Sequence, residues 1–285
     1  MAEDKCRQLI RPSALRALLS RHGIRLRGGL GQHFLVDGNI LSHIVAAIRD
    51  TGGKRAVEVG AGVGTLTCAL APHLERLWAV EVDPRLIPIL REQVAPWPQV
   101  EVLQADFLDL SLARFGEDLL VVGNLPYQIT SPVLLKLIRE REAVAWGVFL
   151  VQREVGEKLA APPGPRASRL GVHLRAYYEL ELLRRVPRTA FYPPPEVESL
   201  LIRLRKLPRP LISSPPATFE ATLKLVFSGR RKSLRRVLRT LLPRKDVEAL
   251  LLDLKIDPLL RGEALDIPEL DELARELEER GVFKS

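Results

Sequence analysis

Cysteines are scarce in this chain, and long apolar runs are absent. Cys6 and Cys68 are its two cysteines among 285 residues, and neither belongs to a C-x-x-C pair or to a Cys/His cluster. We therefore expect two reduced thiols, no disulfide framework and no metal site. No stretch reaches the roughly 18 apolar residues of a membrane span, so we expect none. Met1–Lys5 carries both charge signs without an apolar run, so we expect no signal peptide and a cytoplasmic location.

Acidic residues are fewer than basic ones. The chain has 43 Lys and Arg against 35 Asp and Glu, a net charge of +8, which suggests a polyanion as partner. The imbalance is concentrated, because Arg203–Lys245 holds 13 basic residues and one acid, whereas Asp246–Ser285 holds 12 acids and 5 basic residues. The basic block is either a nucleic-acid-binding surface or a solvated helix face. The near absence of compensating acids favours the first.

Short apolar runs alternate with helix-like patterns over the first part of the chain. The runs predict strands at 56–59, 77–82, 100–104, 119–122 and 144–151. The helical patterns cover 13–22, 39–49, 66–74, 86–93, 132–138 and 154–160. Alternation of helices with nearly all-apolar strands predicts an α/β, Rossmann-like fold with a parallel, doubly wound sheet. Two later runs, 177–186 and 199–204, predict an antiparallel pair of strands at the sheet edge.

A Pro-rich stretch divides the chain. Residues 207–216 predict a linker, and the pattern beyond them is helical at 219–227, 233–242, 246–254 and 268–280. We therefore expect an α/β domain over 1–207 and a small all-helical domain over 208–285. Residues 1–52 of the first domain form a helical extension with a glycine-rich loop. No helix offers a clear seam for self-pairing, so we expect a monomer.

A glycine-rich turn follows the first predicted strand of the sheet. Gly60, Gly62 and Gly64 lie between the strand that ends at Val59 and the helix that starts near Leu66. Glycines let the backbone approach a ligand closely, and the helix start offers unpaired N–H groups. The G-x-G-x-G spacing differs from the G-x-G-x-x-G of pyrophosphate binders. The alternative is a glycine turn without a ligand.

Acidic residues end the next two strands. Glu81 lies at the end of the second strand and suits both hydroxyls of a ribose, while Asp83 is expected to cap the following helix. Asp106 ends the third strand and suits the exocyclic amine of an adenine, with Phe107 packed on the ring; an exposed loop acid beside a core aromatic is the alternative. A nucleoside pocket without a phosphate clamp favours S-adenosylmethionine over NAD.

The most specific motif is Asn124-Leu125-Pro126-Tyr127, after the fourth strand. The lone pair of an adenine N6 amine is delocalised into the ring, so methyl transfer to it needs acceptors for the amine N–H groups. The Asn124 oxygen and the Leu125 carbonyl are such acceptors, and Pro126 fixes the turn that presents the carbonyl. Tyr127 supplies an aromatic face for an extruded base. Methyl transfer is then an in-line displacement, and its rate depends on how the amine and the methyl group are positioned. A plain turn of the Asn-Pro type is the alternative.

With these motifs the chain resembles the ribosomal RNA adenine dimethyltransferase family, and within it the bacterial members that act on the small subunit. The resemblance covers nearly the whole chain, from about Gly31 to about Leu270. Beyond the motifs above, it rests on Gly31–Leu35, Gln152–Val155, Phe191–Ser199, Phe227–Arg235 and Ile256–Leu265. It implies a class I S-adenosylmethionine-dependent methyltransferase fold with a helical C-terminal RNA-binding domain.

The resemblance also implies roles for individual residues. The cofactor contacts are His33, Leu35, Gly60, Glu81, Asp106 and Asn124. The target-base site is Asn124, Leu125, Pro126 and Tyr127, with Phe191 as a second aromatic wall or as part of a structural bend. This chain has His33 where the family usually has Asn, Ala61 where Pro is common, and Glu196 and Glu198 where Lys and Asp are more usual.

The basic block contains a dense group of cations: Arg230, Arg231, Lys232, Arg235, Arg236 and Arg239. On a helix, positions 232, 235, 236 and 239 share one face, which suits the phosphates of a structured RNA. Pairing with the acidic tail at 266–279 is the alternative, and the two can coexist.

The activity that the resemblance implies is N6,N6-dimethylation of two adjacent adenosines near the 3′ end of small-subunit (16S) rRNA, late in subunit assembly. One alternative is a large-subunit rRNA methyltransferase that confers antibiotic resistance, which the C-terminal matches disfavour. Another is an rRNA-binding assembly factor without turnover. An NAD-dependent oxidoreductase is disfavoured by the glycine spacing and by the Asn124–Tyr127 motif.

Overall fold

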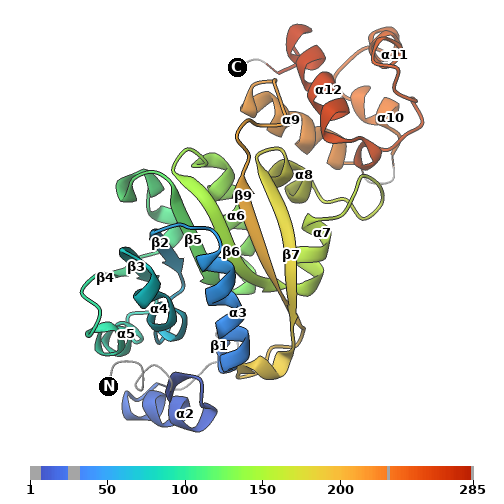
Figure 1. The fold of residues 1–285 in the computed structure, drawn as a ribbon. Helices are drawn as coiled ribbons and strands as arrows, with labels where there is room; N and C mark the ends of the chain where they lie inside the picture. Colours follow the sequence, from blue (N-terminus) through green and yellow to red (C-terminus); the bar gives the residue numbers. More distant parts are fainter. Residues whose placement is uncertain (1–7, 25–32, 230–231, 284–285) are drawn as a thin grey trace. The chain divides into compact units, whose positions relative to one another are not determined.

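The computed structural model describes residues 8–24, 33–229 and 232–283 (Figure 1). The chain divides into two compact units: the first unit is Met1–Gly156 with Leu180–Lys206, and the second unit is Glu157–Glu179 with Leu207–Ser285. The sequence placed residues 157–179 in the first domain. They belong with the second unit because, for example, the amides of Leu207 and Leu211 donate to the carbonyls of Tyr177 and Ala176, both at 2.9 Å. Within the described ranges, no helix is both long and apolar enough to span a bilayer.

A seven-stranded mixed sheet organises the first unit, in the order β4-β3-β2-β5-β6-β9-β7. Its strands are β2 (Arg55–Val59), β3 (Arg76–Glu81), β4 (Val100–Gln104), β5 (Leu119–Asn124), β6 (Val144–Gln152), β7 (Tyr178–Val186) and β9 (Ser199–Lys206). Strands β2 to β6 are parallel, and β9 runs antiparallel to β6. The predicted Rossmann-like fold is confirmed, and β7 and β9 are neighbours at one edge as expected.

The strand order reverses at β2, which lies between β3 and β5. Right-handed crossovers therefore place the helices that follow β2 and β3 on one face of the sheet, and the helix that follows β5 on the other. The helices that begin in this unit are α2 (Pro12–Arg21), α3 (Gly38–Arg49), α4 (Thr65–Leu70), α5 (Ile87–Val94), α6 (Thr130–Arg139) and α7 (Arg153–Leu159). Helix α4 is shorter than predicted, because Pro72 falls in a 3₁₀ turn that follows it.

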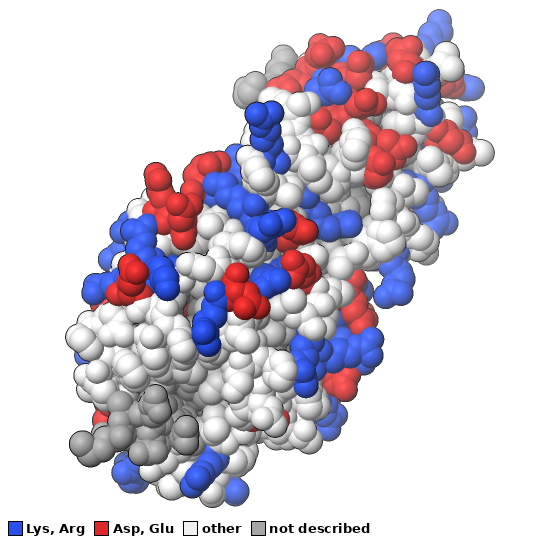
Figure 2. Space-filling view, in the orientation of Figure 1, with Lys and Arg blue, Asp and Glu red and all other residues white. Residues whose placement is uncertain are grey.

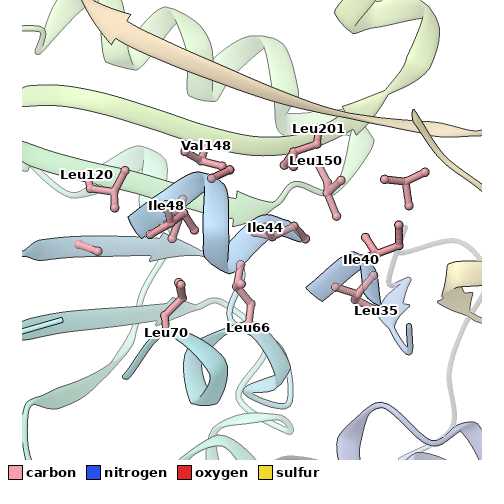
Figure 3. Packing of buried hydrophobic residues seen from close by; sticks show 14 of the residues in the cluster. Leu35, Ile40, Ile44, Ile48, Leu66, Leu70, Leu120, Val148, Leu150 and Leu201 are labelled. Carbon is pink, nitrogen blue, oxygen red and sulfur yellow. The ribbon is translucent and has the colours of Figure 1, made fainter. Parts of the chain in front are cut away.

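Helix α3 packs against the centre of the sheet (Figure 3). The carboxylate of Asp37 starts this helix by accepting from the amides of Asn39 and Ile40 at 2.9 and 3.0 Å. One stripe of the helix, with Ile40, Ile44 and Ile48, faces strand side chains. Its partners on β5, β6 and β9 are Leu120, Val148, Leu150 and Leu201. This packing fixes the chain that enters β2 and the glycine-rich turn beyond it.

The first unit also contains a small two-stranded sheet. Strand β1 (Phe34–Leu35) pairs antiparallel with β8 (Phe191–Tyr192), and the amide of Val36 donates to the Ala190 carbonyl at 2.8 Å. Strands of two residues are too short to show a periodic pattern, so sequence reasoning missed them. The pairing ties the segment before α3 to the chain that leads into the three prolines at 193–195.

The second unit is helical. It contains the end of α7, then α8 (Arg169–Arg175), α9 (Pro216–Phe227), α10 (Leu234–Leu238), α11 (Arg244–Asp253) and α12 (Ile267–Glu279). Helix α8 was not predicted. Helix α10 is half the predicted length and begins where the amides of Leu234 and Arg235 donate to the carbonyls of Leu260 and Pro258. Asp271 of α12 holds the segment before α9 by accepting four hydrogen bonds from Ser213 and Ser214.

Candidate active site

A cavity of about 430 Å³ opens at the carboxyl ends of β2, β3, β4 and β5. This is the point where the strand order reverses, the usual place for ligands in open α/β sheets. Its size is within the range of small-molecule pockets, roughly 300–1,000 Å³. The cavity brings together nearly all of the predicted site residues of the first unit: His33, Leu35, Gly60, Glu81, Asp106, Asn124, Leu125, Pro126 and Tyr127.

The glycine-rich turn lines the cavity with Gly60 and Gly62. Gly60, Gly62 and Gly64 have φ angles of +70°, +58° and +90°, in the left-handed region that side chains avoid. A Cβ on Gly62 would also lie 3.1 Å from Cε1 of Phe34. A Cβ on Gly64 would lie 3.0 Å from Cδ1 of Leu90, so the turn needs glycine for its backbone conformation and, at Gly62 and Gly64, for space as well.

Glu81 is 6% exposed and is held by two backbone amides. Its Oε2 accepts from Gly62 N–H at 2.7 Å, and its Oε1 accepts from Asp83 N–H at 2.8 Å. Burial raises the pKa of Glu81, and these two hydrogen bonds oppose the rise. Each carboxylate oxygen has a second lone pair. Both oxygens can therefore accept one further hydrogen bond from a ligand without breaking the existing pair.

Asp83 caps a turn and not the helix that was expected. Its Oδ1 accepts from the amide of Arg85 at 3.0 Å, and the Arg85 guanidinium donates to both carboxylate oxygens. Helix α5 begins later, at Ile87. Val82, between the two acids, lines the cavity and is 63% exposed, so it offers an apolar surface to a flat ring.

Glu58 also lines the cavity, and sequence reasoning assigned it no role. It lies inside β2, is 2% exposed, and its Oε2 has no hydrogen-bond partner among the described residues. Burial raises the pKa of Glu58 to about 8; Thr67 beside it opposes the rise, and the Glu81 carboxylate adds to it. An acid between two valines of a buried strand was the signal that could have identified it, because such residues are almost never buried without a reason.

Asp106 follows β4 at the rim of the cavity. Its Oδ1 accepts from the amide of Leu108 at 2.8 Å and caps the 3₁₀ turn Phe107–Asp109. The side chain is exposed, whereas Phe107 is 3% exposed. The carboxylate keeps accepting capacity for a ligand amine, beside an aromatic ring.

Asn124 ends β5 in a fixed orientation. Its Nδ2 donates to the carbonyl of His33 at 2.7 Å. A carbonyl can only accept, so the amide nitrogen faces His33 and Oδ1 faces away from it. Within the part of the chain that the structure describes, nothing donates to this Oδ1 or to the carbonyl of Leu125. The site thus presents two unused acceptors on consecutive residues.

Tyr127 follows in a 3₁₀ turn and is half-buried. Its hydroxyl shares a hydrogen bond of 2.9 Å with Ser199 Oγ, and burial raises its pKa. The ring of His33 lies 5.9 Å from the Tyr127 ring, centroid to centroid, at 30°. His33 Nδ1 is 2.8 Å from the carbonyl of Pro193, so in neutral His33 this nitrogen carries the proton.

Phe191 does not line the cavity. It is 3% exposed, packs in the hydrophobic cluster beneath α3, and lies opposite Leu35 in the β1–β8 pair. Phe191 is therefore separated from the cavity by strand β1, whose Leu35 lines it. Its role as a second aromatic wall stays a prediction. Among the described residues, no group of three or more His, Cys, Asp or Glu side chains is arranged to hold a metal.

Four of the predicted RNA-binding cations are described, and all four are exposed: Lys232, Arg235, Arg236 and Arg239, here called the basic cluster. Arg230 and Arg231 lie outside the described residues. The expected single helical face is wrong, because α10 covers only Leu234–Leu238 and Lys232 precedes it.

Among the described residues, the ion pairs within α12 are made by Arg275 and Arg280, and the acidic tail makes none with the basic cluster. The hydrogen bond from Arg244 lowers the pKa of Glu248 on α11, and Arg235 and Arg239 contribute to the lowering. Figure 2 shows Asp and Glu side chains interspersed with Lys and Arg over the second unit on the face in view.

Comparisons with known proteins agree with this geometry. A family model described as "Ribosomal RNA adenine dimethylase" matches residues 23–274. A relative from Bacillus mycoides (strain KBAB4), named "Ribosomal RNA small subunit methyltransferase A", is 39% identical over 280 residues, 93% of this chain and 96% of the relative. A relative of the same name from Bacillus cereus (strain AH187) matches equally well.

Two solved structures resemble the fold. The 23S rRNA methyltransferase ErmE is 28% identical, with a TM-score of 0.68 over 86% of this chain and 99% of that one. A dimethyladenosine transferase from Plasmodium falciparum has a TM-score of 0.76 at 23% identity, over 87% of this chain and 98% of that one.

Proposed function

The chain belongs to the ribosomal RNA adenine dimethylase family, and we propose that it transfers methyl groups from S-adenosylmethionine to the N6 of two adjacent adenosines near the 3′ end of small-subunit rRNA. The observation that carries the proposal is the fixed amide of Asn124, which leaves Oδ1 and the Leu125 carbonyl as acceptors at the cavity wall. The small subunit is favoured as substrate because relatives named for it are 39% identical over 93% of the chain.

The cavity suits the nucleoside part of the cofactor. The second lone pairs of Glu81 match the two hydroxyls of a ribose, and Asp106 matches an adenine amine. Val82 offers an exposed apolar surface in the same cavity. The glycine turn lets the backbone approach the rest of the molecule. The chemistry that the cofactor supplies is a methyl group on a positively charged sulfur.

The chain's own residues prepare the adenosine. Its N6 carries two N–H donors, and Asn124 Oδ1 and the Leu125 carbonyl accept from them. This pulls the nitrogen from planar towards tetrahedral geometry and frees its lone pair to form the new C–N bond, while the bond between the methyl carbon and the cofactor sulfur breaks and its electron pair stays on sulfur. The nitrogen then releases one proton to water. Tyr127 offers a ring face on which the extruded base stacks. Rate enhancement comes from positioning and preorganised acceptors.

The second unit supplies phosphate contacts. The basic cluster is exposed, and phosphate contacts of this kind give affinity that falls steeply with salt. Such contacts carry no base information. Choice of the adenosines therefore depends on RNA shape and on the base pocket.

The decisive experiment is methyl transfer from labelled S-adenosylmethionine to small subunits that lack these methyl groups, followed by mass spectrometry of the nucleosides. N6,N6-dimethyladenosine at two adjacent positions is expected. Asn124→Ala should retain RNA binding and lose transfer. Absence of product with the wild-type chain, while the cofactor binds, would move the substrate to another RNA or the role to assembly without turnover.

Cofactor binding is tested separately. In Glu81→Gln, an NH₂ group replaces one of the two carboxylate oxygens. This NH₂ group is a donor and faces the N–H of either Gly62 or Asp83, which loses its acceptor. We expect calorimetry to show at least about tenfold weaker cofactor binding, or about 1.4 kcal/mol. Glu101→Gln, at an exposed ion pair on β4, is the matched control. Equal affinity of Glu81→Gln and wild type would reject the ribose assignment.

A further inference from the structure

Tyr127 is anchored from a part of the chain far away in sequence. Its hydroxyl shares a 2.9 Å hydrogen bond with Ser199 Oγ, 72 residues further on. Ser199 is 1% exposed, which is unusual for a serine. A buried hydroxyl needs a hydrogen-bond partner, and Tyr127 is the partner that the structure gives it.

Ser199 is itself held in place. It is the first residue of β9 and pairs with Gln152 at the end of β6. Directly beside it, the amide of Arg153 donates to the Glu198 carbonyl at 2.9 Å, and the Arg153 guanidinium pairs with the Glu198 carboxylate at 2.7 Å. Backbone and side-chain bonds thus fix Ser199 at the end of the β6–β9 ladder.

The same segment supports Tyr127 from a second side. The carbonyl of Pro193 accepts from His33 Nδ1 at 2.8 Å, and the His33 ring lies against the Tyr127 ring. The His33 carbonyl in turn orients Asn124. The segment from Pro193 to Ser199 therefore reaches both residues of the base site, Tyr127 directly through Ser199 and Asn124 through His33.

We propose that Ser199 is a positioning residue for methyl transfer, and that its hydroxyl fixes the Tyr127 ring before the target adenosine arrives. The proposal rests on the proposed function. A tyrosine anchored only at its Cα keeps rotation about two bonds, and a base that stacks on it must first arrest that rotation. The hydrogen bond removes this freedom in advance, which is preorganisation. Displacements of about 1 Å at such sites cost up to about 100-fold in rate.

The test compares Ser199→Ala, Tyr127→Phe and the double variant in single-turnover transfer at saturating cofactor and RNA. Each single variant should be slower by about tenfold, with unchanged affinity for both ligands. The double variant should be no slower than either single one, because both changes remove the same hydrogen bond. Thr130→Val is the matched control, since the Thr130 hydroxyl is buried nearby and has no partner among the described residues.

A second measurement reports the ring directly. With 2-aminopurine in place of the target adenine, stacking on Tyr127 quenches the fluorescence. We expect less quenching in Ser199→Ala and in Tyr127→Phe, and wild-type quenching in Thr130→Val. Wild-type rate and quenching in Ser199→Ala would overturn the proposal, as would multiplicative losses in the double variant. Methyl transfer by the wild-type chain tests the proposed function. The ratio of the single-turnover rates of variant and wild type tests the role of Ser199 as a positioning residue.

Discussion

Replacing Glu58 by glutamine should change how the stability of the first unit depends on pH. The folded chain holds a proton on Glu58 up to a pH of about 8, whereas an unfolded chain releases it near 4.5. Between these values the folded state binds more protons than the unfolded state, so rising pH favours unfolding. The destabilising effect is absent below pH 4.5 and complete above about pH 8.

The magnitude follows from the two pKa values. Each pH unit in this window is worth about 1.4 kcal/mol, so Glu58 weakens the fold by about 3 kcal/mol at pH 7 and about 5 kcal/mol above pH 8. Domains have a total stability of about 5–15 kcal/mol, so the effect is large. Glu58→Gln removes the ionisation but keeps the shape. Its advantage over wild type should grow with pH.

The assay is urea unfolding followed by tryptophan fluorescence at pH 5, 6, 7 and 8. Trp78, Trp97 and Trp146 are the three tryptophans of the chain, and all lie in the first unit, so the signal reports that unit. Glu101→Gln controls for the loss of a surface carboxylate. A stability difference between Glu58→Gln and wild type that stays the same at every pH would refute the reasoning.

Two further predictions concern other parts of the chain. Asp271 accepts four hydrogen bonds from Ser213 and Ser214, which outweigh burial and lower its pKa. The carboxylate therefore stabilises the second unit fully above pH 3.8, and this stabilisation is lost as the pH falls through the pKa of Asp271 in the folded state. Asp271→Asn should cost the second unit about 2 kcal/mol at pH 7, measured by urea unfolding with circular dichroism. Gly62→Ala places a side chain at a left-handed φ and 3.1 Å from Phe34. It should lower the free energy of unfolding by about 1–2 kcal/mol in the same assay and weaken cofactor binding in calorimetry.

The convergence of strand ends was predictable from the sequence. Glu81, Asp106 and Asn124 each follow an apolar run, and parallel strands bring their carboxyl ends to one edge. The structure places all three around one cavity. Periodicity and motif spacing were sufficient here, because each residue's position depends on its own strand.

Contacts between distant segments were not predictable. Ser199 and Tyr127 meet only because β9 runs antiparallel to β6, and the order of strands at a sheet edge leaves no local pattern. The pairing of β1 with β8 also escaped, as two-residue strands have no period. The helical face assigned to Lys232 failed for a related reason, since a distant loop near Pro258 caps α10 and sets its start.

The fixed amide of Asn124 has a consequence for selectivity. In the proposed base site, two adjacent acceptors bind an exocyclic amine, but they repel the carbonyl oxygen that guanine or hypoxanthine carries at the same ring position. The same two acceptors also distinguish how many methyl groups the nitrogen carries. An unmodified amine has two N–H donors and a monomethylated one has one, so both can still bind. A dimethylated nitrogen has none, both acceptors lose their partners, and the site favours release of the finished base.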